Sequence, residues 1–130
     1  SVPFKLSEKA LEQIDGVIYY ENMCILAESK DYSKDDEKKN IDIEPIAKLR
    51  DKLQRRPANV IGSVFSAGGF TDPVTYLVDF MGKDSILLWH GEEIEYCIRK
   101  KRIGYFLKQK YMKRVEEGMH DYNITVGEYI

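Results

Sequence analysis

Apolar and polar residues alternate along the chain in short runs that predict strands separated by helices. The first two apolar runs predict strands from Ile14 to Glu21 and from Met23 to Glu28. Glu21-Asn22 is the predicted turn between them, because asparagine tolerates the left-handed backbone that tight turns use. The second run is apolar at nearly every position, which is typical of a strand buried on both faces. We therefore expect a hairpin whose second strand lies inside a sheet.

Residues 42–56 have the spacing of an amphipathic helix. Asp42 is placed to cap the first turn, and Pro57 follows the last turn, where proline stops a helix. One face carries much positive charge, and the other carries an apolar stripe that we expect to pack on the sheet. The predicted stripe consists of Ile43, Ile46, Ala47, Leu49 and Leu53, with Leu49 at its edge.

A second strand–helix–strand unit follows. Residues 59–66 and 85–89 read as strands, and the glycine turn 67–71 leads from the first of them into a helix over 72–80. This order predicts an α/β fold with a mixed central sheet flanked by helices. The later strands should be parallel and joined by right-handed connections.

The C-terminal third is predicted to be mainly helical. A turn at His90-Gly91 precedes a helix that begins near Glu92, and a last helix runs over 105–117. Gly118 ends that helix, because glycine readily adopts the left-handed conformation found after helices. The tail, 122–130, is predicted to add an edge strand.

Length and composition indicate one domain, residues 1–130, with 43% hydrophobic residues as material for a core. The net charge of -2 gives no nucleic-acid signal, so only the local distribution of charge can indicate such a partner. Cys24 and Cys97 lie inside apolar runs without CxxC spacing, so we expect two reduced core thiols in a cytoplasmic protein. No run approaches the roughly 20 apolar residues of a membrane span, and no secretory signal pattern is present. We therefore expect no membrane partner.

Asp15, Glu28 and Lys30 are the leading candidates for chemistry. Strand side chains repeat with a period of two, so Glu28 and Lys30 should emerge on one face, and the hairpin could bring Asp15 beside them. Two carboxylates suit Mg²⁺, and the carbonyl of Ser29 is a natural third oxygen ligand. A nearby lysine can position an attacking water or stabilise charge on phosphorus. The same spacing also fits a simple ion pair or a solvated strand end.

Other polar features each have a structural and a functional interpretation. The charged loop 30–40 is either a solvated connection or a loop that orders against a ligand. The segment 66–72 is either a plain strand-to-helix turn or a phosphate contact through its glycine amides. His90 and His120 are isolated and lack zinc-site spacing, and His90 suits a structural position or the rim of a site.

Basic residues gather in two places, at the end of the helix 42–56 and before the last helix. They suit either contacts with a DNA backbone or solvated helix faces balanced by the many acids. The candidate DNA-contacting residues are Arg50, Lys52, Arg55 and Arg56 in the first place and Arg99, Lys100, Lys101 and Arg102 in the second.

An ordered set of blocks resembles one nuclease family. Gln13-Ile14-Asp15-Gly16, followed by an apolar strand that closes in Ala27-Glu28-Ser29-Lys30, resembles the PD-(D/E)xK nucleases, and within them the Mrr-like restriction endonucleases. Later blocks similar to a bacterial Mrr-like subgroup are Leu53-Gln54-Arg55-Arg56-Pro57, the segment from Gly62 to Thr71, the segment from Ile86 to Glu95, and the segment from Lys101 to Gly118. The resemblance covers most of the chain and implies a three-layer restriction-endonuclease-like core with a mixed central sheet.

The resemblance also implies roles for individual residues. Asp15 and Glu28 match the two acidic metal ligands of the motif, and Lys30 matches the lysine that assists the attacking water. Gln13 stands in a matching position beside the aspartate and is implied to support the site. The implied cofactor is Mg²⁺, with Mn²⁺ as an alternative. The implied partner is DNA, and the implied activity is hydrolysis of DNA phosphodiester bonds in defence against foreign DNA.

One departure separates this chain from the family pattern. The family has a helix before the hairpin, often with another acid near the site, whereas fewer than fifteen residues precede Asp15 here. We expect that helix to be missing or cut away, and a partner chain in a homodimer is one way to cover the gap. The departure keeps a second interpretation open, namely a non-catalytic nucleic-acid-binding or assembly module on the same fold.

Overall fold

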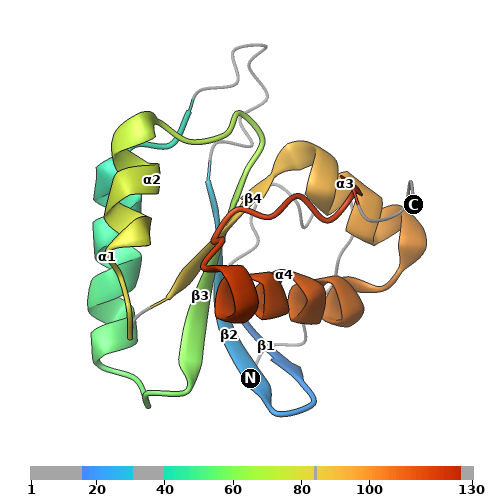
Figure 1. The fold of residues 1–130 in the computed structure, drawn as a ribbon, viewed down its shortest axis with the longest axis horizontal. Coiled ribbons are helices and arrows are strands. Elements are labelled where there is room, and N and C mark those ends of the chain that lie inside the picture. Colours follow the sequence, from blue (N-terminus) through green and yellow to red (C-terminus); the bar gives the residue numbers. More distant parts are fainter. Residues whose placement is uncertain (1–15, 31–39, 84, 127–130) are drawn as a thin grey trace.

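A computed structural model describes residues 16–30, 40–83 and 85–126, and a sheet lies at the centre of this part (Figure 1). Its strands are β1 (Gly16–Tyr20), β2 (Met23–Lys30), β3 (Val60–Ser66) and β4 (Ile86–His90). The order across the sheet is β1-β2-β3-β4; β1 pairs antiparallel with β2, and β2, β3 and β4 run parallel. The predicted hairpin, the inner position of its second strand and the mixed sheet are therefore confirmed.

Helices cover both faces of the sheet, which gives three layers (Figure 1). One face carries α1 (Ile43–Gln54) and α2 (Asp72–Asp79), and the other carries α3 (Gly91–Lys100) and α4 (Ile103–Glu117). From β2 through α1 to β3 and through α2 to β4, the chain advances across the sheet in one direction. Two crossovers of the same hand then place both helices on the same face. The α/β class predicted from the sequence is confirmed for the described residues.

The core has two halves because strand residues alternate between the faces. Phe65 and Trp89 belong to the half under α3 and α4, with ring centroids 5.3 Å apart. The indole nitrogen of Trp89 donates a hydrogen bond of 3.1 Å to the Ser63 hydroxyl, so this buried polar pair is satisfied. The other half contains Ile46, Leu49, Leu53, Val64, Val74, Val78, Ile86 and Leu88.

Gly62 allows α1 to lie close to the sheet. A Cβ atom at this position would meet Leu49 Cδ2 at 3.0 Å, Leu53 Cδ1 at 3.1 Å and Ile86 Cγ1 at 3.2 Å. Contacts this short require the neighbouring side chains to move, because protein interiors are close-packed. The packing of α1 therefore depends on the absence of a side chain at residue 62.

Some predicted details at the hairpin and α1 are wrong. The turn is at Glu21-Asn22, but Glu21 adopts the left-handed backbone, with φ of 52°. In α1, Ile43 and Ala47 are exposed, whereas Leu49 is fully buried and does not lie at the edge of the stripe. Ala47 is turned about 100° around the helix from Ile46, which carries it away from the sheet.

The C-terminal third also differs from the prediction. No turn separates β4 from α3, because His90 is both the last strand residue and the N-cap of the helix. The tail forms no strand in its described part, 122–126. The side-chain oxygen of Asn123 instead accepts hydrogen bonds from the backbone nitrogen and the hydroxyl of Thr125, and such side-chain bonds favour a turn over an extended chain.

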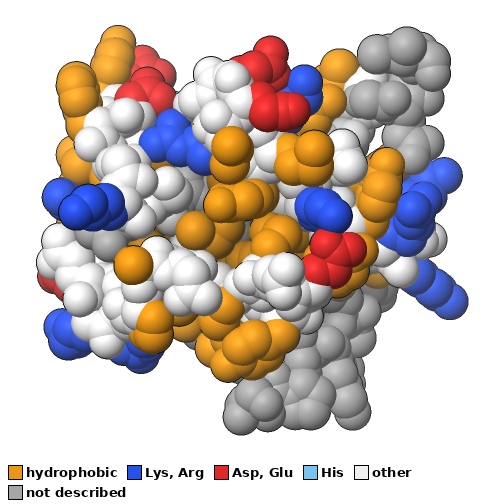
Figure 2. All heavy atoms as spheres, turned by 60° about the horizontal axis from the view of Figure 1, so that its bottom comes forward, with side chains coloured by type: hydrophobic (Ala, Val, Ile, Leu, Met, Phe, Trp, Pro, Cys, Tyr) orange, Lys and Arg blue, Asp and Glu red, His pale blue; other side chains and the backbone are white. Residues whose placement is uncertain are grey.

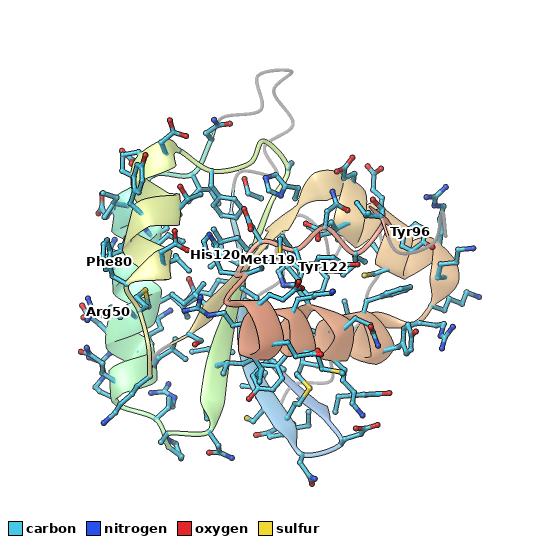
Figure 3. The ribbon with its side chains drawn as sticks, in the orientation of Figure 1. Arg50, Phe80, Tyr96, Met119, His120 and Tyr122 are labelled. Carbon is cyan, nitrogen blue, oxygen red and sulfur yellow. The ribbon has the colours of Figure 1, made fainter. Side chains whose placement is uncertain are left out.

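The segment after α4 ties the two helical layers to β4. Figure 3 shows Met119, His120 and Tyr122 along this segment. The backbone nitrogen of Leu88 donates to the His120 carbonyl at 2.8 Å, and His120 Nδ1 lies 2.8 Å from a carboxylate oxygen of Asp79 at the end of α2. These contacts protect part of the outer edge of β4, which would otherwise be open to pairing with other chains.

Both cysteines are free thiols, of which Cys97 is fully buried and Cys24 partly buried. Burial and the nearby charge of Glu93 raise the pKa of the Cys97 thiol to about 12, so this thiol stays neutral at physiological pH. The expectation of a core thiol is confirmed for Cys97. In the described part of the chain, no helix is both long and apolar enough to cross a membrane.

Candidate functional site

Glu28 is the described member of the predicted acidic pair. It lies near the carboxyl end of β2, opposite Val64 of β3, and strand alternation turns it toward α1. Only 6% of the residue is exposed. Its Oε1 atom accepts a hydrogen bond of 2.5 Å from the Nζ atom of Lys52 in the last turn of α1. The fold thus buries a carboxylate near the carboxyl end of an inner strand and places one cation beside it.

A charged pocket of about 250 Å³ opens beside this ion pair. It is lined by Glu28, Pro45, Lys48, Asp51, Lys52 and Arg55. The three cations lie on one helical face of α1, because residues three, four and seven positions apart share a face. The pocket therefore combines carboxylates that can take a cation with cations that can take an anion.

The Glu28 carboxylate has the chemistry and the position of a magnesium ligand. Its oxygens are of the type that Mg²⁺ prefers, and Mg²⁺ commonly uses one or two protein carboxylates and keeps several waters. Among residues 16–30, 40–83 and 85–126, no three His, Cys, Asp or Glu side chains gather as metal ligands. A complete site would need Asp15, which lies outside these ranges, as does Gln13.

Lys30 is the last residue of β2, where it pairs with Ser66 of β3. The backbone of positions 28 and 30 pairs with Val64 and Ser66, two residues apart on β3. The charged loop lies outside the described residues over 31–39. The structure thus places Glu28, Ser29 and Lys30 at the end of an inner strand, an edge where open α/β sheets commonly hold their sites.

The glycine turn after β3 is closed by its own serine. The Ser66 hydroxyl donates to the Gly69 carbonyl at 2.7 Å and accepts from the Gly69 backbone nitrogen at 3.0 Å. Gly69 has a φ of 98°, a conformation that suits glycine. Because this amide already has an internal acceptor, the contact favours the structural interpretation of the turn.

A buried ion pair that was not predicted from the sequence links α3 and α4. Glu93 and Lys110 are both fully buried, and Lys110 Nζ donates to Glu93 Oε1 at 2.5 Å. Lys110 Nζ also donates to the Tyr122 carbonyl at 2.8 Å and lies 4.5 Å from the centroid of a Trp89 ring. Two sequence signals could have revealed the pair: a Glu three residues after an N-cap, and a Lys in helical register with the apolar Phe106 and Leu107.

Glu93 remains a carboxylate inside the core. Burial by itself raises the pKa of Glu93, but hydrogen bonds from His90 and the adjacent Lys110 ammonium outweigh it, so the pKa lies below its ordinary value. The His90 backbone nitrogen donates to Glu93 Oε2 at 2.7 Å, and the backbone nitrogen of Ile124 donates to Oε1 at 3.2 Å. These bonds place His90, at 43% side-chain exposure, on the rim where β4 becomes α3.

The two basic groups do not form one surface. Lys52, Arg55 and Arg56 lie at the end of α1, whereas Arg99 to Arg102 join α3 to α4 on the opposite face of the sheet. Arg102 lies 4.1 Å from the centroid of the Tyr105 ring, and Arg99 lies 5.7 Å from that of Tyr96. The α1 group adjoins Glu28, and the other group packs against aromatic rings.

A larger groove, of about 880 Å³, lies near the hairpin turn and the second half of α4. Figure 2 brings this end of the molecule forward and shows apolar side chains across its centre. Met23, Tyr111 and Val115 contribute apolar surface to it, and Glu21 and Lys108, which form an ion pair at 2.8 Å, also line it. We place the candidate site at the smaller pocket because that pocket contains the buried carboxylate at the strand ends.

Comparisons of the chain with models of known protein families, with characterised proteins and with solved structures find no match. The likeness to Mrr-like nucleases therefore remains a prediction from the residues quoted above.

Proposed function

We propose that this domain is a metal-dependent endonuclease that hydrolyses DNA phosphodiester bonds, on a restriction-endonuclease-like core of the Mrr-like group. The observation that carries the proposal is the placement of Glu28, a buried acid near the end of an inner strand, beside a pocket lined with cations. The ordered blocks that resemble Mrr-like enzymes add support. Defence against foreign DNA is the role that this resemblance suggests.

In this proposal, Asp15 and Glu28 hold the metal through carboxylate oxygens, with the carbonyl of Ser29 as a further ligand. When bound, Mg²⁺ or Mn²⁺ lowers the pKa of the attacking water and offsets the charge of the phosphate. Lys30 orients that water, and Gln13 supports Asp15. Each of these residues lies in the hairpin or directly before it.

In this proposal, the cations of α1 hold the DNA backbone next to Glu28. Lys48 and Arg55 line the same pocket as the carboxylate. Phosphate contacts from such residues position DNA without reading its sequence. We therefore expect the backbone to run along α1 near the carboxyl end of β2.

The ion pair between Lys52 and Glu28 also supports a second candidate, a nucleic-acid-binding or assembly module without catalysis. A carboxylate that is already paired at 2.5 Å can serve as a structural link between β2 and α1. In that case DNA binding would depend on salt, and divalent metal would not matter to it.

Cleavage of plasmid DNA with and without Mg²⁺ tests the first candidate. We expect Asp15→Ala, Glu28→Gln and Lys30→Ala to lower the rate by about a hundredfold or more, because each removes stabilisation needed in the transition state. Glu117→Gln is the matched control, since Glu117 is an exposed acid at the end of α4 that pairs with Lys113 away from this pocket. Circular dichroism checks that each variant is folded. Equal, metal-independent cleavage by wild type and all variants would refute the proposal.

A further inference from the structure

The ion pair at the candidate site is asymmetric. The Glu28 side chain is 8% exposed and is held by β2, whereas the Lys52 side chain is 46% exposed and extends from α1 on four methylene groups. Lysine has a long flexible chain and a strongly hydrated ammonium. The pair can therefore open by movement of Lys52 alone, without a change in the sheet.

The neighbouring lysine on the same helix, Lys48, pairs with a different acid. Lys48 lies one turn before Lys52 and lines the same pocket, but its Nζ atom pairs with Glu44 at 3.2 Å, and both of these side chains are largely exposed. Lys52 is thus the cation that the described residues place on Glu28. Lys48 offers a control with the same charge, the same helix and the same pocket.

We infer that Lys52 is a counter-ion that occupies Glu28 until a divalent metal replaces it, a positioning role that rests on the proposed function. A divalent ion that binds Glu28 Oε1 competes with the Lys52 ammonium for this oxygen and repels it. Binding of the metal at this oxygen therefore displaces Lys52. The metal affinity is reduced by the free energy needed to open the ion pair.

The released ammonium has a second use. It would face the pocket beside Lys48 and Arg55, where three cations on one helical face suit a phosphate group. A DNA phosphate that takes Lys52 leaves Glu28 without its counter-ion, so DNA and metal should favour each other's binding. Lys52 thereby couples the substrate to the metal.

Titration of Mn²⁺ into the full chain without DNA, followed by electron paramagnetic resonance, tests the inference without reference to activity. We expect Lys52→Met to bind Mn²⁺ about three- to tenfold more tightly than wild type, because partly exposed ion pairs contribute energies of that order. Lys52→Arg keeps a cation and should bind within about twofold of wild type. Lys48→Met should also stay within about twofold, because its charge does not contact Glu28.

The possible results separate the inference from the proposed function. Equal or weaker Mn²⁺ binding by Lys52→Met overturns the inference, and the proposed function survives if Glu28→Gln still abolishes the binding. An equal gain in Mn²⁺ affinity in Lys48→Met and Lys52→Met also overturns the inference, because loss of any positive charge near the pocket would then explain the gain. If Glu28→Gln leaves Mn²⁺ binding unchanged in both the wild-type and the Lys52→Met backgrounds, both the inference and the metal site are wrong.

Discussion

Glu93 and Lys110 form an ion pair in which each buried charge depends on its partner. Both side chains are inaccessible to solvent, and backbone or side-chain groups from His90, Tyr122 and Ile124 complete their hydrogen bonds. Loss of one partner would leave the other as an uncompensated charge in the core, which costs much more than loss of a surface ion pair. The pair thus joins α3, α4 and the C-terminal segment.

Replacement of Glu93 by Gln should lower the free energy of unfolding by about 3 to 5 kcal/mol, because Lys110 would lose its counter-ion. Urea denaturation at several pH values measures this. The pKa of Glu93 is lowered in the folded state, so its contribution is present above the ordinary value near 4.5 and is lost as the pH falls through the folded pKa. Wild type should therefore lose more stability than Glu93→Gln below about pH 4.5. Parallel pH profiles would contradict this account.

At the scale of elements, the contact between α1 and the sheet decides where Lys52 lies. Leu49 and Leu53 pack over Gly62 in the first half of β3, which holds the C-terminal half of α1 close to the sheet. Lys52 then reaches Glu28 from the last turn of α1. The geometry of the candidate site thus rests on a close helix–sheet approach.

Gly62→Ala should destabilise the domain by about 1 to 3 kcal/mol, because the new methyl group must push Leu49, Leu53 or Ile86 aside. Chemical denaturation measures the change. Gly82→Ala is the matched control, since a Cβ at residue 82 meets nothing within 4 Å. Equal stability of the two variants would show that α1 adjusts without cost.

At the scale of the whole molecule, the sheet separates the two basic groups, each of which lies at the end of a helix. The end of α1 lies on the face of Glu28, and the junction of α3 and α4 lies on the other face. Under the proposed function, DNA that reaches Glu28 therefore meets the α1 group first. The basic group at the junction of α3 and α4 could contact DNA only along a different path. Otherwise its role is structural.

Arg55→Gln should weaken DNA binding and lower the slope of log K against log salt concentration by about 0.9, as expected for loss of one phosphate contact. Arg99→Gln should change neither, because Arg99 lies against Tyr96 on the opposite layer. Fluorescence anisotropy in the absence of divalent metal provides both values without cleavage. Equal losses in the two variants would show that DNA contacts both layers.

The sequence alone determined the order of the elements and the positions of Glu28 and Lys30 at the end of an inner strand. These features follow from local periodicity, in which apolar runs, caps and Gly118 act within a few residues. The same local rules failed for the tail, where Asn123 forms a turn, and for Ile43 and Ala47, whose exposure depends on the rotation of α1.

Only the tertiary structure decided which charges meet. The partners Lys52 and Glu28 are 24 residues apart, and Lys110 and Glu93 are 17 apart, so no local pattern pairs them. Strand register and helix packing bring such groups together, and full burial makes the pairing of Glu93 with Lys110 obligatory. For the same reason, the sequence could nominate Glu28 as a metal ligand, but the fold shows Lys52 as its present partner.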